Sequence, residues 1–140
     1  MKSIIALTAA TLLLAGCARD GKVSVTPDEL MHHRFVLKTV NGAAINPEGN
    51  PPEISFGEKM HISGLMCNRF TGQGKVSDGE LSAKNMVMTR MMCADPQRNQ
   101  LDQTFSAMMN EGAQADLTGN QLTLATAEQT LIFKLADLGQ

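Results

Sequence analysis

The chain has 140 residues, of which 43% are hydrophobic and 19% are charged, and its formal net charge is −2. This length suits one domain with a hydrophobic core, and a weakly acidic chain without a basic run argues against nucleic acid as a partner. Trp and Tyr are absent, Phe occurs 5 times and Met 10 times. We therefore expect the core to be filled mainly by Leu, Ile, Val and Met.

Residues 1–16 have the pattern of a secretory signal peptide. Lys2 supplies a positive charge, residues 4–14 are apolar, and Leu14, Ala15 and Gly16 form a cleavage site. The apolar segment is too short for a helix that crosses the roughly 30 Å hydrocarbon core of a bilayer. We expect it to be removed rather than retained as an anchor.

The four residues 14–17, Leu-Ala-Gly-Cys, resemble the lipobox of bacterial lipoproteins. The resemblance implies that Cys17 becomes the first residue of the mature chain. It would then carry a diacylglycerol and a third acyl chain, with palmitate among the acyl groups. Three chains anchor a protein durably, because each buried methylene contributes about 0.8 kcal/mol. The alternative is a cleaved signal without lipid, in which Cys17 is incidental. Ala18, in place of an aspartate, implies the outer membrane, with the protein on its periplasmic face.

The residues after Cys17 lack an apolar period, so we expect residues 17–30 to form the lipidated end and a flexible tether. Residues 31–140 then form one domain. Its first part is predicted to consist of short strands that alternate in polarity and end at turns such as Asn41-Gly42. The predicted strands are 34–40, 53–56, 59–63, 70–75, 80–83 and 85–91.

Asp95-Pro96 indicates the start of a helix, with an N-cap followed by proline in the first turn. Apolar residues then recur with helical spacing from Leu101 to Met109, and Gly112 is a typical stop. Three more strands follow at 114–117, 121–125 and 130–135. The chain is therefore predicted to be an α+β domain, a strongly curved antiparallel sheet or open barrel of short strands with one inserted helix.

Cys67 and Cys93 are an even pair of cysteines in an oxidising compartment, for which a disulfide is the default interpretation. Free thiols or a metal pair are the alternatives. A disulfide would bring Asn68 and Arg69 close to Arg90 and so form a small cationic recognition patch. The competing interpretation is that Asn68 makes a buried turn hydrogen bond and both arginines are solvated strand ends.

The methionines at 86, 88, 91 and 92 crowd one segment, and thioethers can bind Cu(I) in the periplasm. The simpler interpretation is that Met86, Met88, Met91 and Met92 fill a core that has few aromatic residues. No nucleophile is placed beside a base, and His32, His33 and His61 are expected to be structural or surface residues. We expect no catalytic residues and no cofactor.

Residues 67–72 (Cys-Asn-Arg-Phe-Thr-Gly) and residues 89–96 (Thr-Arg-Met-Met-Cys-Ala-Asp-Pro) resemble the two motifs of the META domain family, which includes heat-inducible lipoproteins of enteric bacteria. The resemblance extends from about His32 to the end of the chain. Met66 stands where the family usually has glycine, Met92 where it has alanine, Gly74 where an aromatic residue is common, and Phe35 where many members have tryptophan. The resemblance implies a similar fold and an association with envelope stress and novobiocin tolerance, without an assigned activity.

Together these features predict a monomeric, non-enzymatic interaction module, tethered to the membrane in the periplasm, whose partner is a protein of the cell envelope. Two alternatives are Cu(I) handling through the methionine segment and inhibition of a hydrolase.

Overall fold

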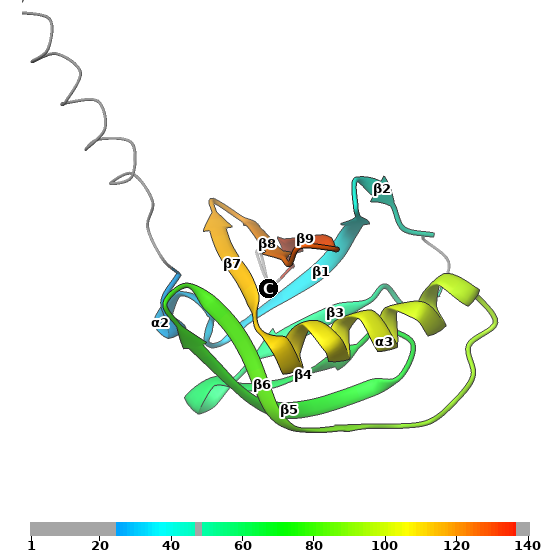
Figure 1. Cartoon of the computed structure of the whole chain (residues 1–140), viewed down its shortest axis with the longest axis horizontal. Coiled ribbons are helices and arrows are strands. Elements are labelled where there is room, and N and C mark those ends of the chain that lie inside the picture. Colours follow the sequence, from blue (N-terminus) through cyan, green and yellow to red (C-terminus); the bar gives the residue numbers. More distant parts are fainter. Residues whose placement is uncertain (1–24, 47–48, 137–140) are drawn as a thin grey trace, which may run out of the picture.

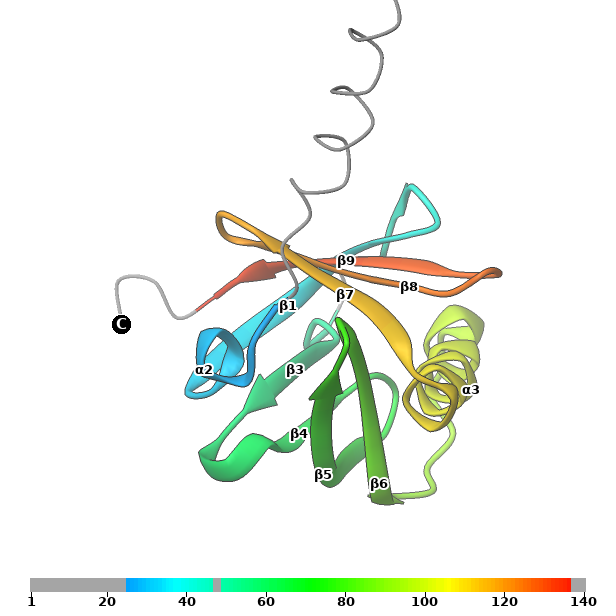
Figure 2. The ribbon, with the colours of Figure 1, turned by 60° about the vertical axis from the view of Figure 1, so that its left-hand side comes forward.

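The computed structural model describes residues 25–46 and 49–136. They fold into an antiparallel barrel with one long helix beside it (Figures 1 and 2). The strands are β1 (His33–Val40), β2 (Ala43–Ala44), β3 (Glu53–Phe56), β4 (His61–Leu65), β5 (Arg69–Ser77), β6 (Glu80–Met88), β7 (Ala113–Thr118), β8 (Gln121–Ala125) and β9 (Thr130–Leu135). The helices are α2 (Pro27–Leu30), a 3-10 turn (Glu58–Met60) and α3 (Pro96–Glu111).

Neighbouring strands pair in the order β2-β1-β3-β4-β5-β6-β7-β8-β9, and β1 also pairs with β9. The second pairing closes the sheet into a ring of eight strands, with β2 as a short hairpin extension of β1. The predicted fold class, a curved antiparallel sheet with one inserted helix, is confirmed. The barrel is closed rather than open.

The seam between β6 and β7 is short. Only Glu80 and Leu81 of β6 pair with β7, whereas β5 pairs with β6 from Phe70 to Ser77. Beyond Leu81 the two strands diverge, and α3, which connects them in sequence, lies beside β6 (Figure 2).

The structure joins the two strands predicted at 80–83 and 85–91 into the single strand β6, which ends at Met88. Asn85 adopts a positive φ of 54°, and the register with β5 shifts between Thr71 and Gln73. This is a β-bulge, which bends a strand without ending it. The polarity pattern breaks at a bulge, and this break explains why the sequence suggested two strands.

Helix α3 begins and ends where the sequence predicted. The Asp95 carboxylate accepts a hydrogen bond from Gln97 N–H at 2.9 Å, and Pro96 occupies the first turn. Gly112 ends the helix with a φ of +96°. Its buried side chains, Leu101, Phe105, Met108 and Met109, pack into the barrel core, while Arg98 donates to the carbonyl oxygens of Asn46 and Asn50.

The barrel interior contains more aromatic residues than we expected from the composition. All five phenylalanines are buried, and of the methionines in the described ranges only four are buried with them. The expectation that Leu, Ile, Val and Met supply the core is therefore incomplete. The buried phenylalanines and methionines are Phe35, Phe56, Phe70, Phe105, Phe133, Met60, Met66, Met108 and Met109.

The folded domain begins earlier than residue 31. Val25 is 4% exposed and Leu30 is fully buried, while the Thr26 N–H donates to the Glu29 carboxylate at 2.9 Å to start α2. The prediction that residues 17–30 form a flexible tether is therefore wrong for residues 25–30. Cys17 and residues 1–16 lie outside the described residues. None of the helices in the described ranges is both long and apolar enough to cross a membrane.

Candidate interaction site

A disulfide bond in the structure links the turn between β4 and β5 to the segment that precedes α3. The sulfur atoms of Cys67 and Cys93 are 2.04 Å apart, and their Cα atoms are 6.0 Å apart. The bond lies between two polar networks, each centred on an asparagine. These networks fix the backbone on both sides of Met92.

The first network is centred on Asn68, a buried residue that is only 6% exposed. Its Oδ1 accepts hydrogen bonds from Met91 N–H and from the Thr89 hydroxyl, both at 2.7 Å. Its Nδ2 donates to the Met91 carbonyl oxygen at 2.9 Å and to Asp102 Oδ2 at 2.7 Å. Asn68 is therefore a structural residue, and its predicted place in the recognition patch is wrong because no part of its amide is left for a partner.

Asp102 on α3 completes this network. Its Oδ1 accepts from the backbone N–H groups of Cys67 and Asn68, at 2.9 and 3.0 Å. The sequence analysis missed Asp102, because a polar residue on a mostly polar helix face has no signal of its own. In the sequence, the one sign that Asp102 lies near the disulfide is its position soon after the N-cap Asp95.

The second network is centred on Asn99 of α3. Its Oδ1 accepts from Cys93 N–H at 3.0 Å, and its Nδ2 donates to the Cys93 carbonyl oxygen at 2.8 Å. Asn68 and Asn99 thus bind both backbone groups of Met91 and of Cys93, respectively. We call residues 89–94 the methionine loop. Met92 lies between the two fixed residues.

The side chains of the methionine loop are exposed although its backbone is fixed. Met91 is 70% exposed and Met92 is 86% exposed. Core filling therefore does not describe these two methionines, whereas Met86 and Met88 are partly buried and do pack against the core. All four line one hollow of about 490 Å³ between the end of β6 and α3, which we call the methionine hollow.

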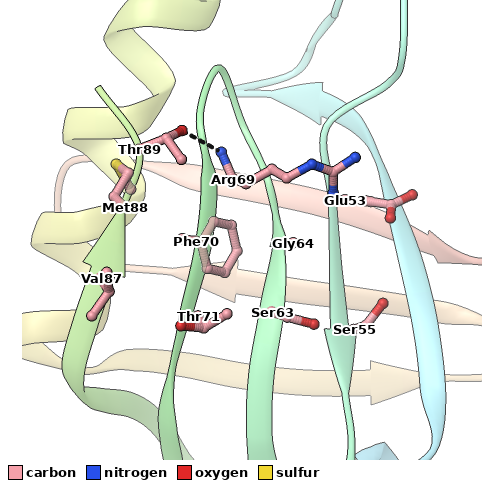
Figure 3. Close-up of a pocket in the computed structure, with 10 residues that line it drawn as sticks. All are labelled: Glu53, Ser55, Ser63, Gly64, Arg69, Phe70, Thr71, Val87, Met88 and Thr89. Atoms are coloured by element: carbon pink, nitrogen blue, oxygen red, sulfur yellow. Dashed lines mark hydrogen bonds between the residues drawn. The ribbon is translucent and has the colours of Figure 1, made fainter. Parts of the chain in front are cut away.

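A second hollow, of about 350 Å³, crosses the outer face of β3 to β6 (Figure 3). Its floor carries a row of small side chains in register, since Ser55 pairs with Ser63, Ser63 with Thr71, and Thr71 with Val87. Val87 is 67% exposed. We call this the outer groove.

Arg69 and Arg90 are both exposed, but they line different hollows. The Arg69 side chain extends across the outer groove toward Glu53, whose carboxylate is paired with Arg34 at 2.6 Å (Figure 3). Arg90 lines the hollow that contains the methionines. Neither guanidinium group forms an ion pair or hydrogen bond with another described residue. The two arginines therefore flank the end of β6 on opposite sides instead of forming one patch.

The three histidines, which the sequence analysis expected to be structural or surface residues, line neither hollow. His32 and His61 are exposed and His33 is partly buried. Within residues 25–46 and 49–136, no group of three or more His, Cys, Asp or Glu side chains is arranged to hold a metal ion.

The chain is similar to known proteins over nearly its whole length. The META domain family model matches residues 28–137. The chain is 64% identical over 138 residues to heat shock protein HslJ of Escherichia coli strain K12, covering 99% of both chains. An NMR structure with 68% identity covers 83% of this chain and 99% of its own, with a TM-score of 0.78. An NMR structure from Burkholderia xenovorans, 22% identical with a TM-score of 0.65, shares the fold and covers 83% of this chain and 92% of its own.

Proposed function

The chain belongs to the META domain family, and from its surface we propose that it is a non-enzymatic interaction module that binds another protein of the cell envelope. The observation that carries this proposal is the methionine loop. Two large apolar side chains are exposed there on a backbone that hydrogen bonds and a disulfide hold in place.

Three properties of exposed methionines on a fixed backbone favour binding. Covering them removes apolar surface from water, which contributes about 25 cal/mol per Å². A backbone that is already ordered loses little conformational entropy when a partner binds. Methionine is also adaptable in shape and recurs at surfaces that bind proteins. The methionine loop combines these three properties.

The charges near the loop suggest which residues the partner supplies. Arg69 and Arg90 are cations without an ionic partner among the described residues, on a chain whose net charge is −2. An arginine fork can bind a carboxylate through two hydrogen bonds. We therefore propose that the partner presents Asp or Glu side chains beside an apolar segment.

The sequence and the relative support a proposal for where and when the chain acts. We propose that Cys17 carries a lipid that anchors the domain to the outer membrane, on its periplasmic face. The 64% identical relative is named a heat shock protein, and on that basis we propose that the chain acts during heat stress in the envelope and affects novobiocin tolerance.

Cu(I) handling is the second candidate, because Met86, Met88, Met91 and Met92 line the same hollow. We favour protein binding over it. The Met86 sulfur is packed against Gly72, so close that a Cβ atom built on that glycine would lie 2.9 Å from it. A thioether held in this way serves packing, and only Met91 and Met92 are freely exposed.

The proposal is tested by complementation of a deletion strain under heat and novobiocin. The full chain with Met91→Gln and Met92→Gln is compared with a control that carries Lys38→Gln and Lys134→Gln, at exposed positions on β1 and β9. We expect both variants to melt like the wild type, and only the methionine variant to lose complementation. A second variant, Arg69→Ala with Arg90→Ala, should show the same loss. Full complementation by the methionine variant would refute the proposal.

A further inference from the structure

The way in which the partner binds can be inferred from the backbone of β6. We propose that an extended segment of the partner adds as a strand along Met88–Arg90, at the open edge where β6 ends and the methionine loop begins, with apolar side chains against the methionines and a carboxylate at Arg90. This inference rests on the proposed function, since it specifies how the bound protein is recognised.

The hydrogen bonds around the end of β6 show which backbone groups are unpaired. Thr89 N–H donates to the Arg69 carbonyl oxygen at 3.0 Å, and both backbone groups of Met91 bind Asn68. These groups point toward β5. Backbone groups alternate in direction along an antiparallel strand, so the N–H and C=O groups of Met88 and Arg90 point to the opposite side.

On that side β6 has no neighbouring strand. Its pairing with β7 is confined to Glu80 and Leu81, at the far end of the strand. Outside the pairing of β5 with β6, no hydrogen bond among the described residues engages the backbone of Met88 or Arg90. Two N–H and two C=O groups are therefore free in the arrangement that an added strand requires.

Proteins commonly protect such an edge with a bulge or with lysine. The first part of the β6 edge has both, in the bulge at Asn85 and in Lys84, which is exposed. Neither device is present from Met86 onward, and α3, a helix that could cover an edge in the same way, is set off from this part of the chain by the hollow of about 490 Å³. The edge is therefore protected beside Ser82–Lys84 and open beside the methionine loop.

The two hollows lie on either side of this open edge. The outer groove and the methionine hollow share Met88 and Thr89 among their lining residues. In an added strand, successive side chains point alternately to the two sides. One set would enter the methionine hollow beside α3, and the other would lie against Val87 and the outer groove.

Arg90 supplies the charge complementarity for an acidic residue in the added strand. The carboxylate in the same hollow, Asp102, already accepts hydrogen bonds from Cys67 N–H, Asn68 N–H and Asn68 Nδ2. It therefore does not pair with Arg90 and does not compete with a carboxylate of the partner. The fitting partner segment is extended, alternates apolar residues, and carries Asp or Glu near its centre.

The test uses the full chain in detergent micelles and, as the probe, an acetylated peptide of alternating valine and threonine with one central glutamate. We expect saturating peptide to slow amide hydrogen exchange of Met88 and Arg90 by tenfold or more, as new backbone hydrogen bonds form there, while Thr89 and Met91 change little. N-methylation of the peptide at alternate residues should abolish binding in one register and leave it in the other. Arg90→Gln should weaken binding about tenfold, the size of one charge-assisted pair, and the control Lys84→Gln should not.

Several outcomes would overturn the inference. One is the absence of protection at Met88 and Arg90 with millimolar peptide, and another is equal binding of both N-methylated peptides. If either occurs while the methionine variant still loses complementation, strand addition is wrong and the proposed interaction function stands. If the methionine variant complements fully, the proposed function itself fails.

Discussion

The side-chain amide of Asn68 pairs with both backbone groups of Met91, 23 residues further along the chain, through hydrogen bonds of 2.7 and 2.9 Å. The amide takes the place that the next residue of a β-strand would occupy beside β6. It thus extends the β5–β6 ladder past the end of β5 and fixes the first exposed methionine. A residue chosen from its sequence as a contact for partners is in fact a support for the surface that we propose to bind them.

We predict that Asn68→Ala destabilises the domain by about 3 kcal/mol, because the Met91 N–H, the Thr89 hydroxyl and one Asp102 oxygen all lose a partner. Urea unfolding measures the change. Asn110→Ala, at an exposed position on α3, is the matched control and should change the free energy of unfolding by less than about 0.5 kcal/mol. If Asn68→Ala also lowers the free energy of unfolding by less than about 0.5 kcal/mol, the network contributes little to stability.

We predict that Cys67 and Cys93 are joined in the purified protein. The intact mass without reductant should then be two hydrogens below that of the reduced chain. Replacing both cysteines with serine should lower the free energy of unfolding by about 3.5 kcal/mol in the chain-entropy model, because the bond spans 26 positions in sequence. Alkylation of both thiols without reductant would contradict the prediction.

The elements that the sequence predicted well depend on local chemistry. Asp95, Pro96 and Gly112 define α3 because capping and helix termination act over a few residues. The alternation of polar and apolar residues gave most of the strands for a similar reason. Closure of the barrel could not be predicted in this way, since it depends on the pairing of β1 with β9, at opposite ends of the domain.

The site was predicted less completely than the fold. The two cysteines indicated the right region, but the roles of its polar residues depend on contacts between distant segments. Asn68 reaches Asp102, 34 positions away, only because α3 packs against the β4–β5 turn. Met91 and Met92 are exposed because of these contacts and because β6 ends at Met88. The sequence did not indicate this strand end, since the bulge at Asn85 breaks the polarity pattern of β6.

We predict that Cys17 is lipidated. Growth with radiolabelled palmitate should label the wild-type chain, and the protein should fractionate with the outer membrane. Cys17→Ser should abolish the label and either release the protein into the soluble fraction or block its processing. An unlabelled wild-type chain would refute the prediction.

We predict that Gly64→Ala destabilises the barrel by about 3 kcal/mol, the upper part of the usual range for overpacking. A Cβ atom at this position would collide with the Glu53 carbonyl oxygen on β3 and would lie 2.8 Å from the ring of Phe70, which is buried. Neither group can move without disturbing the β3–β4–β5 ladder. Gly57→Ala is the control, because its Cβ would meet only the His61 carbonyl oxygen, at 3.8 Å. Thermal unfolding of both variants measures the difference, and equal melting temperatures would contradict it.

We predict that the full chain does not bind Cu(I) tightly. Cu(I) prefers thiolate and thioether ligands, but both described cysteines are joined in the structure and the Met86 sulfur is packed against Gly72. Arg90 lines the same hollow and would repel a cation. Met88 is partly buried and packs against the core, so Met91 and Met92 alone leave the ion without the three or four soft ligands that would hold it. Competition against a chromogenic Cu(I) chelator under anaerobic conditions measures the uptake, with Met91→Gln and Met92→Gln as the comparison. Transfer of one equivalent of Cu(I) to the wild type, lost in that variant, would reverse the order of the two candidate functions and make metal handling the role of the methionine loop.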